Sequence, residues 1–273
     1  SDEVAAAYPG RELKFGPDYL IPTPFDVRLI LRIAPAVAQA AMDSGVATRP
    51  IADLEAYRHG LTRFVYQTGM FMRPVFAAAR AFNAKDAARI VYAEGEDERV
   101  LRAVQVVLDE GLARPILIGR PEIIRMRIER AGLRLQPGRD FESVDPADDP
   151  RFRAYWESYL KLMSRDGVTP EAAKAAVRRS NTLIGSLMLK RGEADGLLCG
   201  LVGRYDSHLE HVRAVIGNKP GMRTMAAMNA LMLEEYTLFI ADTFVNEEPD
   251  AEELAEIAAM AAAEVRRFGI PPK

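Results

Sequence analysis

The clearest hydrophobic pattern lies in the middle of the chain, where short apolar runs alternate with longer segments whose apolar residues recur every three or four positions. The runs at 90–92 and 115–118 predict strands, and a weaker run at 141–144 predicts a third. The segments between them, 97–109 and 121–131, predict helices. Such alternation is typical of an α/β fold, in which helices flank a largely parallel sheet.

The stretch 192–217 carries the strongest functional signal. Its apolar run at 197–199 predicts a short strand between glycines, and the apolar residues after it recur at helical spacing. The loop 203–206 (GRYD) lies between them, at the carboxyl end of the predicted strand. Open α/β sheets bind their ligands at that end of the strands, so we expect the functional site near this loop.

The amino-terminal third has a different pattern. Residues 1–32 are rich in proline, glycine and aromatic residues without a regular period, which predicts an extended segment packed over another part of the protein. Helices are predicted over 34–42, 50–66 and 69–82. The third helix carries an apolar stripe that is typical of a core or an interface, formed by Met70, Phe71, Val75 and Phe76.

The last part of the chain continues the mixed pattern. Residues 151–191 predict a helical block, 224–233 and 237–241 predict strands, and 250–267 predicts a final helix. A glycine and two prolines follow that helix and signal its end. The alternation predicts a further strand beyond this point. We therefore expect the chain to be an excerpt of a longer polypeptide at both ends.

The composition excludes several classes of protein. Of the 273 residues, 49% are apolar, enough for a substantial core. The 36 basic and 39 acidic residues leave a net charge of −3, which does not attract nucleic acid or an anionic membrane. No apolar run approaches the roughly 20 residues of a membrane-spanning helix, and the first residues lack the pattern of a signal peptide. A single cysteine permits no internal disulfide, so we expect a cytoplasmic protein.

The acidic segment 94–99 occupies the position of a dinucleotide-binding loop, between the first predicted strand and its helix. It lacks the three spaced glycines of such a loop, and its acidic residues would repel a pyrophosphate. We interpret Glu96, Asp97 and Glu98 as complements to the positive end of the helix dipole. This argues against a nicotinamide site in the sheet.

A histidine pair and the cysteine are further candidates. His208 and His211 are three residues apart and share one helical face, but no third histidine lies nearby. We interpret them as partly exposed flanking residues rather than metal ligands. Cys199 lies in an apolar run with no obvious base beside it, so we interpret it as a buried structural thiol rather than a nucleophile.

Three arginines and a tyrosine are the candidate ligand-binding residues. Arg178 and Arg179 precede an apolar helix, and Arg204 and Tyr205 lie in the loop described above. If the two groups converge, they suit a phosphate or pyrophosphate, because arginine binds phosphate through two parallel hydrogen bonds. If they do not converge, they are solvated surface residues.

Two separate segments resemble known families. Residues 15–26 (FGPDYLIPTPFD) and 40–47 (AAMDSGVA) are similar to the carboxyl-terminal edge of the malic enzyme domain in large bacterial NADP-dependent malic enzymes. Residues 89–273 are similar to the amino-terminal portion of phosphate acetyl- and butyryltransferases, with EGEDERVLRA, PILIG, GEADG and TLFIADT in family order. The two segments in this order resemble the junction of a hybrid malic enzyme.

The resemblance implies three parts and a fold. These are the edge of the malic enzyme domain at 1–48, a helical linker at 49–86 and a phosphotransacetylase-like domain at 87–273 that is incomplete at its carboxyl end. The implied fold of the last part is the one shared with isocitrate and isopropylmalate dehydrogenases.

The resemblance also implies a function for the parent protein. Hybrid malic enzymes oxidatively decarboxylate malate to pyruvate and CO2 with NADP and Mg²⁺ or Mn²⁺, through residues that would lie before Ser1, so we expect no catalytic or metal-binding residue in this chain. The appended domain is implied to be regulatory, to sense acetyl-CoA, and to support a homo-oligomer with the malic enzyme domain as its partner. We expect acetyl-CoA to contact Arg204, Tyr205, Arg178 and Arg179.

Two departures from the transferase pattern bear on catalysis. Active phosphotransacetylases have one arginine where this chain has Glu210 and another near Met163. A carboxylate in place of a phosphate-binding cation reverses the local charge, so we expect acetyl transfer to phosphate to be lost. Two alternatives stay open. One is a catalytic phosphate acetyltransferase that forms acetyl phosphate and CoA, and the other is a dimerisation domain that binds no nucleotide.

Overall fold

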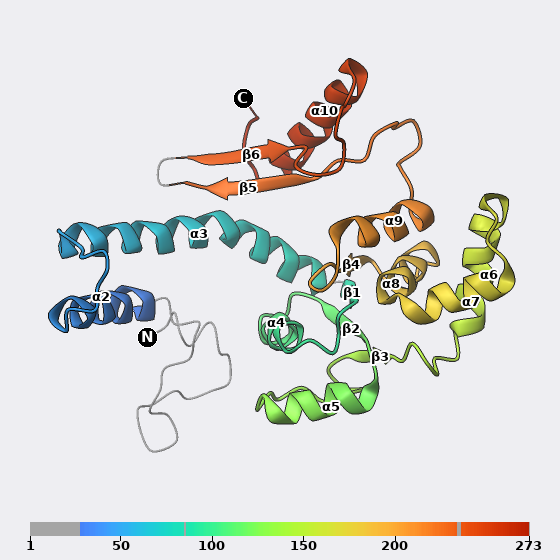
Figure 1. Ribbon diagram of the computed structural model, residues 1–273, viewed down its shortest axis with the longest axis horizontal. Coiled ribbons are helices and arrows are strands. Elements are labelled where there is room, and N and C mark those ends of the chain that lie inside the picture. The colour runs from blue at the N-terminus through green and yellow to red at the C-terminus, as the bar shows by residue number, and fades with distance from the viewer. Residues whose placement is uncertain (1–27, 85, 234–235, 273) are drawn as a thin grey trace. The chain divides into compact units, whose positions relative to one another are not determined.

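The computed structural model describes residues 28–84, 86–233 and 236–272, and for residues 28, 62–71, 73 and 74 it describes the backbone alone. The chain forms two compact units. One consists of residues 78–223, and the other of the remaining described residues. Figure 1 labels the elements of both units.

The larger unit contains a four-stranded parallel sheet. Its strands are β1 (Arg89–Tyr92), β2 (Arg114–Ile118), β3 (Glu142–Val144) and β4 (Gly196–Leu198), in the order β3-β2-β1-β4. The first three strands progress in one direction across the sheet, and β4 then pairs with the other side of β1 (Figure 1). The carboxyl ends of β1 and β4 are therefore the topological switch point. The predicted α/β fold is confirmed.

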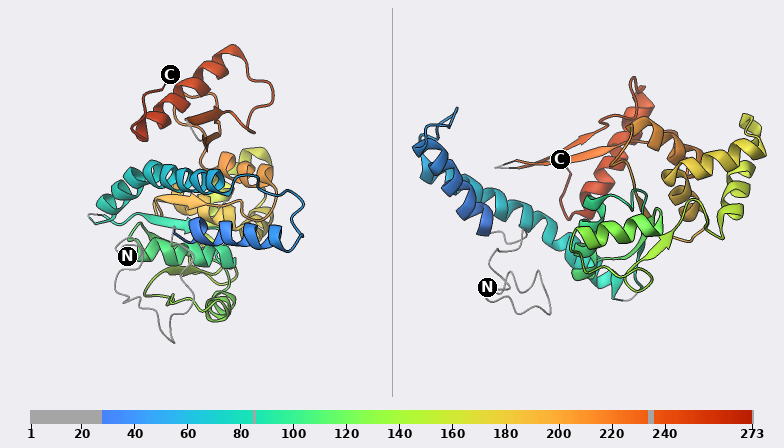
Figure 2. Two further views of the ribbon diagram at one scale, coloured as in Figure 1. Left: turned by 90° about the vertical axis from the view of Figure 1, so that its left-hand side faces the viewer. Right: turned by 60° about the horizontal axis from the view of Figure 1, so that its bottom comes forward.

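Helices cover both faces of this sheet (Figure 2). Because successive side chains of a strand point to opposite faces, Val91 and Tyr92 belong to different cores. The core around Tyr92 and Leu117 is closed by α4 (Glu98–Asp109) and α5 (Pro121–Arg130). The core around Val91 is closed by four helices, α6 (Phe152–Met163), α7 (Pro170–Arg179), α8 (Asn181–Lys190) and α9 (Tyr205–Val215).

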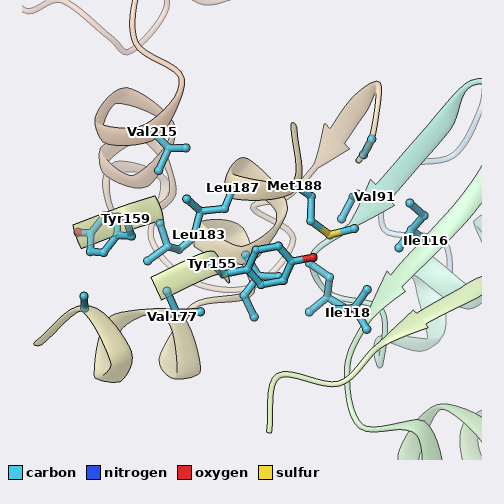
Figure 3. Close-up of a cluster of buried hydrophobic side chains, with 14 residues drawn as sticks. Val91, Ile116, Ile118, Tyr155, Tyr159, Val177, Leu183, Leu187, Met188 and Val215 are labelled. Atoms are coloured by element: carbon cyan, nitrogen blue, oxygen red, sulfur yellow. The ribbon is translucent and has the colours of Figure 1, made fainter. Parts of the chain in front are cut away.

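Helix α8 is the centre of the second core, because it is buried on all sides from Thr182 to Met188. Leu183 and Leu187 are fully buried (Figure 3). Each fully buried side chain of this kind contributes about 1.5–3 kcal/mol to stability. Gly185 lets the helix approach the sheet, since a Cβ at this position would lie 2.6 Å from Leu197 Cδ1 and 3.3 Å from Val91 Cγ1.

The predicted helical block divides where its side chains cap helix ends. A short 3-10 turn, Ser164–Asp166, follows α6 and ends at Gly167 in the left-handed region, with φ of 83°. The side chain of Thr169 then caps α7, and Pro170 takes the first helical position. Ser180 ends α7 and caps α8, because its hydroxyl accepts a hydrogen bond from the Leu183 N–H at 3.1 Å. A sharp turn at Ser180 thus separates the two helices.

The amino-terminal helices differ from the sequence prediction. Helix α2 begins at Arg28 rather than at residue 34 and runs to Asp43 with Pro35 inside it, so residues 28–32 are helical and not extended. The helices predicted at 50–66 and 69–82 are one helix, α3 (Leu54–Asn83). A single glycine such as Gly69 costs a helix only about 1 kcal/mol relative to alanine, so it does not end α3. The segment 15–26 and the side chains of Met70 and Phe71 lie outside the described residues.

The second unit contains an antiparallel strand pair, β5 (Met228–Met232) and β6 (Thr237–Ala241), which forms a sheet separate from the parallel one. The first strand is shorter than the predicted 224–233. Helix α10 (Ala251–Arg267) starts with a capping box between Asp250 and Glu253, and Phe268 at its end contacts the Phe239 ring of β6 at 6.1 Å between centroids.

Among the described residues, no helix is both long and apolar enough to cross a membrane.

Arg89 and Asp195 join the starts of β1 and β4. The Arg89 guanidinium donates hydrogen bonds to both carboxylate oxygens of Asp195, at 3.0 and 2.9 Å. The Arg89 backbone N–H donates to the same carboxylate at 2.8 Å, and the Asp195 N–H donates back to the Arg89 carbonyl at 2.8 Å. The hydrogen bonds from Arg89 lower the pKa of Asp195 to about 2.

We predict that Asp195→Asn removes an acid-sensitive part of the stability. The pKa of Asp195 is about 2 in the folded chain and about 3.9 in an unfolded one, so its contribution is complete above about pH 4 and is lost as the pH falls through 2. The variant should have a lower urea midpoint than the parent at pH 6, and the two midpoints should converge toward pH 2. Asp148→Asn, at an exposed aspartate of the same unit, should show no such convergence. A gap that stays constant over this range would contradict the prediction.

Candidate functional site

A pocket of about 420 Å³ opens at the switch point of the parallel sheet. Its walls come from the end of β1 and the following loop, from the first turns of α4, and from the end of β4 and its loop. The lining residues are Tyr92, Glu94, Arg99, Val100, Ala103, Leu198, Cys199, Gly200 and Leu201. The volume lies within the range of small-molecule sites, and most of the wall is apolar.

Hydrogen bonds hold the loops after β1 and β4 together. The Ala93 N–H, one residue after β1, donates to the carbonyl of Leu198, the last residue of β4, at 3.0 Å. The Glu94 carboxylate then accepts a hydrogen bond from the Gly200 N–H at 2.9 Å. On α8, the side-chain amide of Asn181 donates to the Ala93 carbonyl at 2.8 Å. These contacts position the pocket walls relative to one another.

The acidic segment after β1 has two roles rather than one. Asp97 caps α4 by accepting a hydrogen bond from the Arg99 N–H at 2.8 Å, and Glu98 lies in the first turn of that helix. Both complement the helix dipole, as predicted. Glu96 instead pairs with Arg120 in the loop after β2, with two contacts of 2.8 Å. Arg120 also lowers the pKa of Glu96, so this residue joins two loops at the carboxyl edge of the sheet.

His208 is hydrogen-bonded through both ring nitrogens. Its Nδ1 lies 2.7 Å from Thr182 Oγ1, and its Nε2 lies 2.8 Å from the Val202 carbonyl oxygen. Gly203 leaves room for the ring, since a Cβ there would lie 2.9 Å from Nε2, and its φ of +109° disfavours other residues. Burial lowers the pKa of the neighbouring His211. The described residues contain no group of three His, Cys, Asp or Glu side chains that could hold a metal ion.

The predicted burial of Cys199 is only partial, while its interpretation as a structural thiol rather than a nucleophile stays a prediction. Strand β4 ends at Leu198, so Cys199 is the first residue of the loop, where it is partly buried and lines the pocket. Burial and the nearby Glu94 carboxylate raise the pKa of the thiol. The strand ends one residue earlier than the apolar run predicts, and for this reason Cys199 lines the pocket.

The predicted ligand-binding residues do not line this pocket. Arg204 is the residue before α9, with its side chain 82% exposed, and it pairs with Asp206 at 2.6 Å. Tyr205 is the first residue of α9 and is half exposed. Arg178 and Arg179 end α7, and the Arg178 guanidinium lies over the Phe152 ring at 4.7 Å. Their contact with acetyl-CoA stays a prediction.

The sequence interpretation missed Thr182 and the individual role of Glu94. Thr182 is 2% exposed in an apolar helix, and its partner His208 is far away in the sequence. Glu94 belongs to a run of acidic residues whose other members cap a helix or pair with arginines. One signal was available, because a polar residue directly after a parallel strand lies at the ligand-binding edge of the sheet.

The model of the phosphate acetyl/butaryl transferase family matches residues 70–273, most of the chain. The chain belongs to this family. A phosphotransacetylase from Streptococcus pyogenes has a similar fold, with a TM-score of 0.66 and 29% sequence identity over 74% of this chain and 60% of its own. The transferase part of the predicted resemblance is confirmed, and so is the phosphotransacetylase-like fold.

The malic enzyme part of the resemblance is confirmed as well. The NADP-dependent malic enzyme of Salmonella typhimurium is 55% identical over all 273 residues. A malic enzyme of Rhizobium meliloti, described as NAD-dependent, is 56% identical over the same length. In each case the match covers 35% of the relative, so the chain spans about a third of the length of these proteins.

We predict that Gly95→Ala distorts the loop next to the pocket. The Gly95 N–H donates to the Ile118 carbonyl at 3.1 Å, and a Cβ on this residue would lie 2.8 Å from that oxygen and 2.9 Å from Ile118 N. Backbone atoms of a central strand cannot move aside, so the substitution should lower the free energy of unfolding by about 1–3 kcal/mol. Gly60→Ala in α3, where no atom lies within 4 Å of the added Cβ, should raise it by up to about 1 kcal/mol. Equal urea midpoints for the two variants would contradict this account.

Proposed function

We propose that this chain is the regulatory and assembly portion of an NADP-dependent malic enzyme, and that its transferase-like domain binds acetyl-CoA without transferring the acetyl group. The observation that carries the proposal is the extent of the match. Malic enzymes are similar to the chain over its whole length, including residues 1–69, which the transferase family model does not cover. Malate oxidation itself belongs to the parent enzyme. Its NADP and its Mg²⁺ or Mn²⁺ would be bound outside this chain.

The switch-point loop does not suit NADP. Phosphate groups bind at helix N-termini through free backbone N–H groups, usually with glycines that permit close approach. At the N-terminus of α4, the Asp97 carboxylate already accepts a hydrogen bond from the Arg99 N–H. Glu96 and Glu98 add negative charge nearby. A pyrophosphate would meet these carboxylates. This supports a module without a nicotinamide coenzyme of its own.

The loss of acetyl transfer rests on the charge of one face of α9. Glu210 is exposed on this helix, where the resemblance to active transferases implies an arginine. Burial raises the pKa of Tyr159 on α6, and the negative charge of the Glu210 carboxylate raises it further. This effect indicates a negative potential around Glu210. An anionic phosphate substrate would be repelled where a catalyst needs attraction.

Self-association is supported by apolar side chains on the second unit. The strand pair and its flanking loops expose large hydrophobic residues at 40% or more of their surface, namely Leu231, Leu233, Tyr236, Leu238, Ile240 and Phe244. Monomeric proteins rarely expose so many apolar side chains from one short segment. A homo-oligomer, or the malic enzyme domain of the same polypeptide, would cover them.

The alternative is a catalytic phosphate acetyltransferase, which the family match favours. An assay of acetyl-CoA with inorganic phosphate separates the two functions. We predict that neither this chain nor its parent enzyme forms acetyl phosphate above a blank without protein, and that the chain alone does not reduce NADP with malate. A phosphotransacetylase of known activity is the positive control. Acetyl phosphate formation that depends on the parent enzyme would overturn the proposal in favour of the alternative.

Arg204 tests the effector site in the parent enzyme. We predict that Arg204→Ala raises the acetyl-CoA concentration for half-maximal effect on malate oxidation by about tenfold, because a charged hydrogen bond to a phosphate would be lost. Arg153→Ala is the matched control, since Arg153 is 81% exposed and pairs with a glutamate on its own helix. The activity without acetyl-CoA should not change in either variant. Unaltered sensitivity of the Arg204 variant would move the predicted contact to Arg178 and Arg179.

A further inference from the structure

The pocket at the switch point carries a negative charge that no cation compensates within the described part of the chain. Two of its lining residues are charged, Glu94 and Arg99. The Arg99 guanidinium donates hydrogen bonds to both carboxylate oxygens of Asp97, at 3.0 and 2.9 Å, so its charge is paired. Among the described residues Glu94 has no ion-pair partner, and its carboxylate accepts one hydrogen bond, from the Gly200 N–H at 2.9 Å. The pocket wall is therefore negative at Glu94.

The Tyr92 hydroxyl is a second polar group of the pocket wall with unused hydrogen-bonding capacity. The Tyr92 side chain lines the pocket and is 6% exposed. No described residue forms a hydrogen bond with its hydroxyl. Burial raises the pKa of Tyr92, so the hydroxyl stays protonated near neutrality and can both donate and accept. Buried polar groups normally have a partner, and a molecule bound in the pocket can supply one here.

The rest of the wall is mainly apolar. Val100 and Ala103 come from α4, and Leu198 and Leu201 come from the end of β4 and its loop. Leu198 is 55% exposed and Leu201 is 41% exposed. An apolar body that covers these side chains removes their surface from water. The attraction between a cation and a carboxylate is also stronger beside such surface than in bulk water.

We propose that this pocket binds a small organic cation, an ammonium group on an apolar body of about the size of one aromatic ring. The Glu94 carboxylate is the counter-ion, and the Gly200 N–H holds it in place. The Tyr92 hydroxyl is a further hydrogen-bonding group for the ligand. The apolar body packs against Val100, Leu198 and Leu201.

The charge of the site separates it from the predicted contacts of acetyl-CoA. Glu94 repels the phosphate groups of such a ligand, and the pocket-lining residues do not include Arg178, Arg179 or Arg204. Binding of a cation here is independent of the malic enzyme function. Either property can fail while the other holds.

Three probes with a common body test the site in the full chain, namely 2-phenylethylammonium, 2-phenylethanol and 3-phenylpropanoate. Each is titrated at pH 7, and occupancy is read as protection of Cys199 from iodoacetamide, because Cys199 lines the pocket. Cys199 is the only cysteine in the sequence, and the tryptic peptide 192–204 identifies the modified site by mass. The same titrations on the chain unfolded in urea correct for any reaction between probe and reagent.

We expect the ammonium probe to protect Cys199 with a dissociation constant on the order of 1 mM, as suits a ligand of this size. The alcohol should bind about tenfold more weakly, since a hydrogen bond to a charged group is stronger when the donor is also charged. The carboxylate probe should give no protection. The proposal is overturned if the alcohol or the carboxylate protects as well as the ammonium, or if no probe protects at about 30 mM.

Glu94→Gln tests the counter-ion. The amide oxygen can still accept the Gly200 N–H, but the charge is lost, so the affinity for the ammonium probe should fall about tenfold while that for the alcohol stays within about twofold. Glu122→Gln, at an exposed glutamate in the first turn of α5, is the matched control and should bind like the parent. An equal loss in both variants would assign the attraction to the net charge of the chain and overturn the proposal. If Glu94→Gln does not fold, the order of the three probes in the parent decides.

Tyr92→Phe tests the hydroxyl. The substitution keeps the ring in the wall and removes the O–H, so the ammonium probe should bind about fivefold more weakly, the usual effect of losing one hydrogen bond. A variant that folds and binds all three probes like the parent would overturn the assignment of Tyr92 to the site.

Discussion

The rest of the larger unit depends on the pairing of β1 with β4, two short strands 106 residues apart in the sequence. Strand β4 has only three residues, so its backbone hydrogen bonds alone are few. Side chains extend the pairing at both ends, with Asp195 binding Arg89 at the starts of the strands and Glu94 binding the Gly200 N–H after them. Strands β2 and β3 are added on one side of β1, whereas this pairing adds β4 on the other side. The change of side creates the switch point where the pocket opens.

Helix α8 connects this pairing with the chemistry of the pocket. Its buried side packs closely on β1 and β4 because Gly185 has no side chain. Its first turn supplies Asn181, which binds the loop after β1, and Thr182, which binds His208. A change in the core that shifts the helix would move both polar contacts together. Packing beneath the sheet and geometry at its edge are therefore coupled through one rigid element.

The sheet and most helices of the larger unit could be predicted from the sequence, because their apolar positions repeat with clear periods and their ends carry capping residues such as Asp97 and Ser180. The edge of the sheet at which the pocket opens could be predicted, but the contacts that shape the pocket could not, since they join residues that are close only after folding. Thr182 looks like one more small residue in an apolar helix, and Cys199 looks like the last residue of a strand. The sequence pattern predicts two helices where the structure has the single helix α3, because Gly69 resembles a helix end. One glycine costs a helix less free energy than the other residues of a long helix contribute.

The features that maintain the fold do not include Glu210, the residue on which the proposed loss of acetyl transfer rests. The sheet is held by two apolar cores, by the links between β1 and β4, and by helix caps, none of which involves Glu210. Helix α9 is anchored by Val215 in the core and by His208 at its first turn, while Glu210 stays exposed. An arginine and a glutamate at that position would therefore be nearly equivalent for folding and opposite in charge toward a phosphate. A chain can keep the family's architecture while such an exchange changes the ligand that the surface accepts, so the fold alone does not decide whether the transferase chemistry persists.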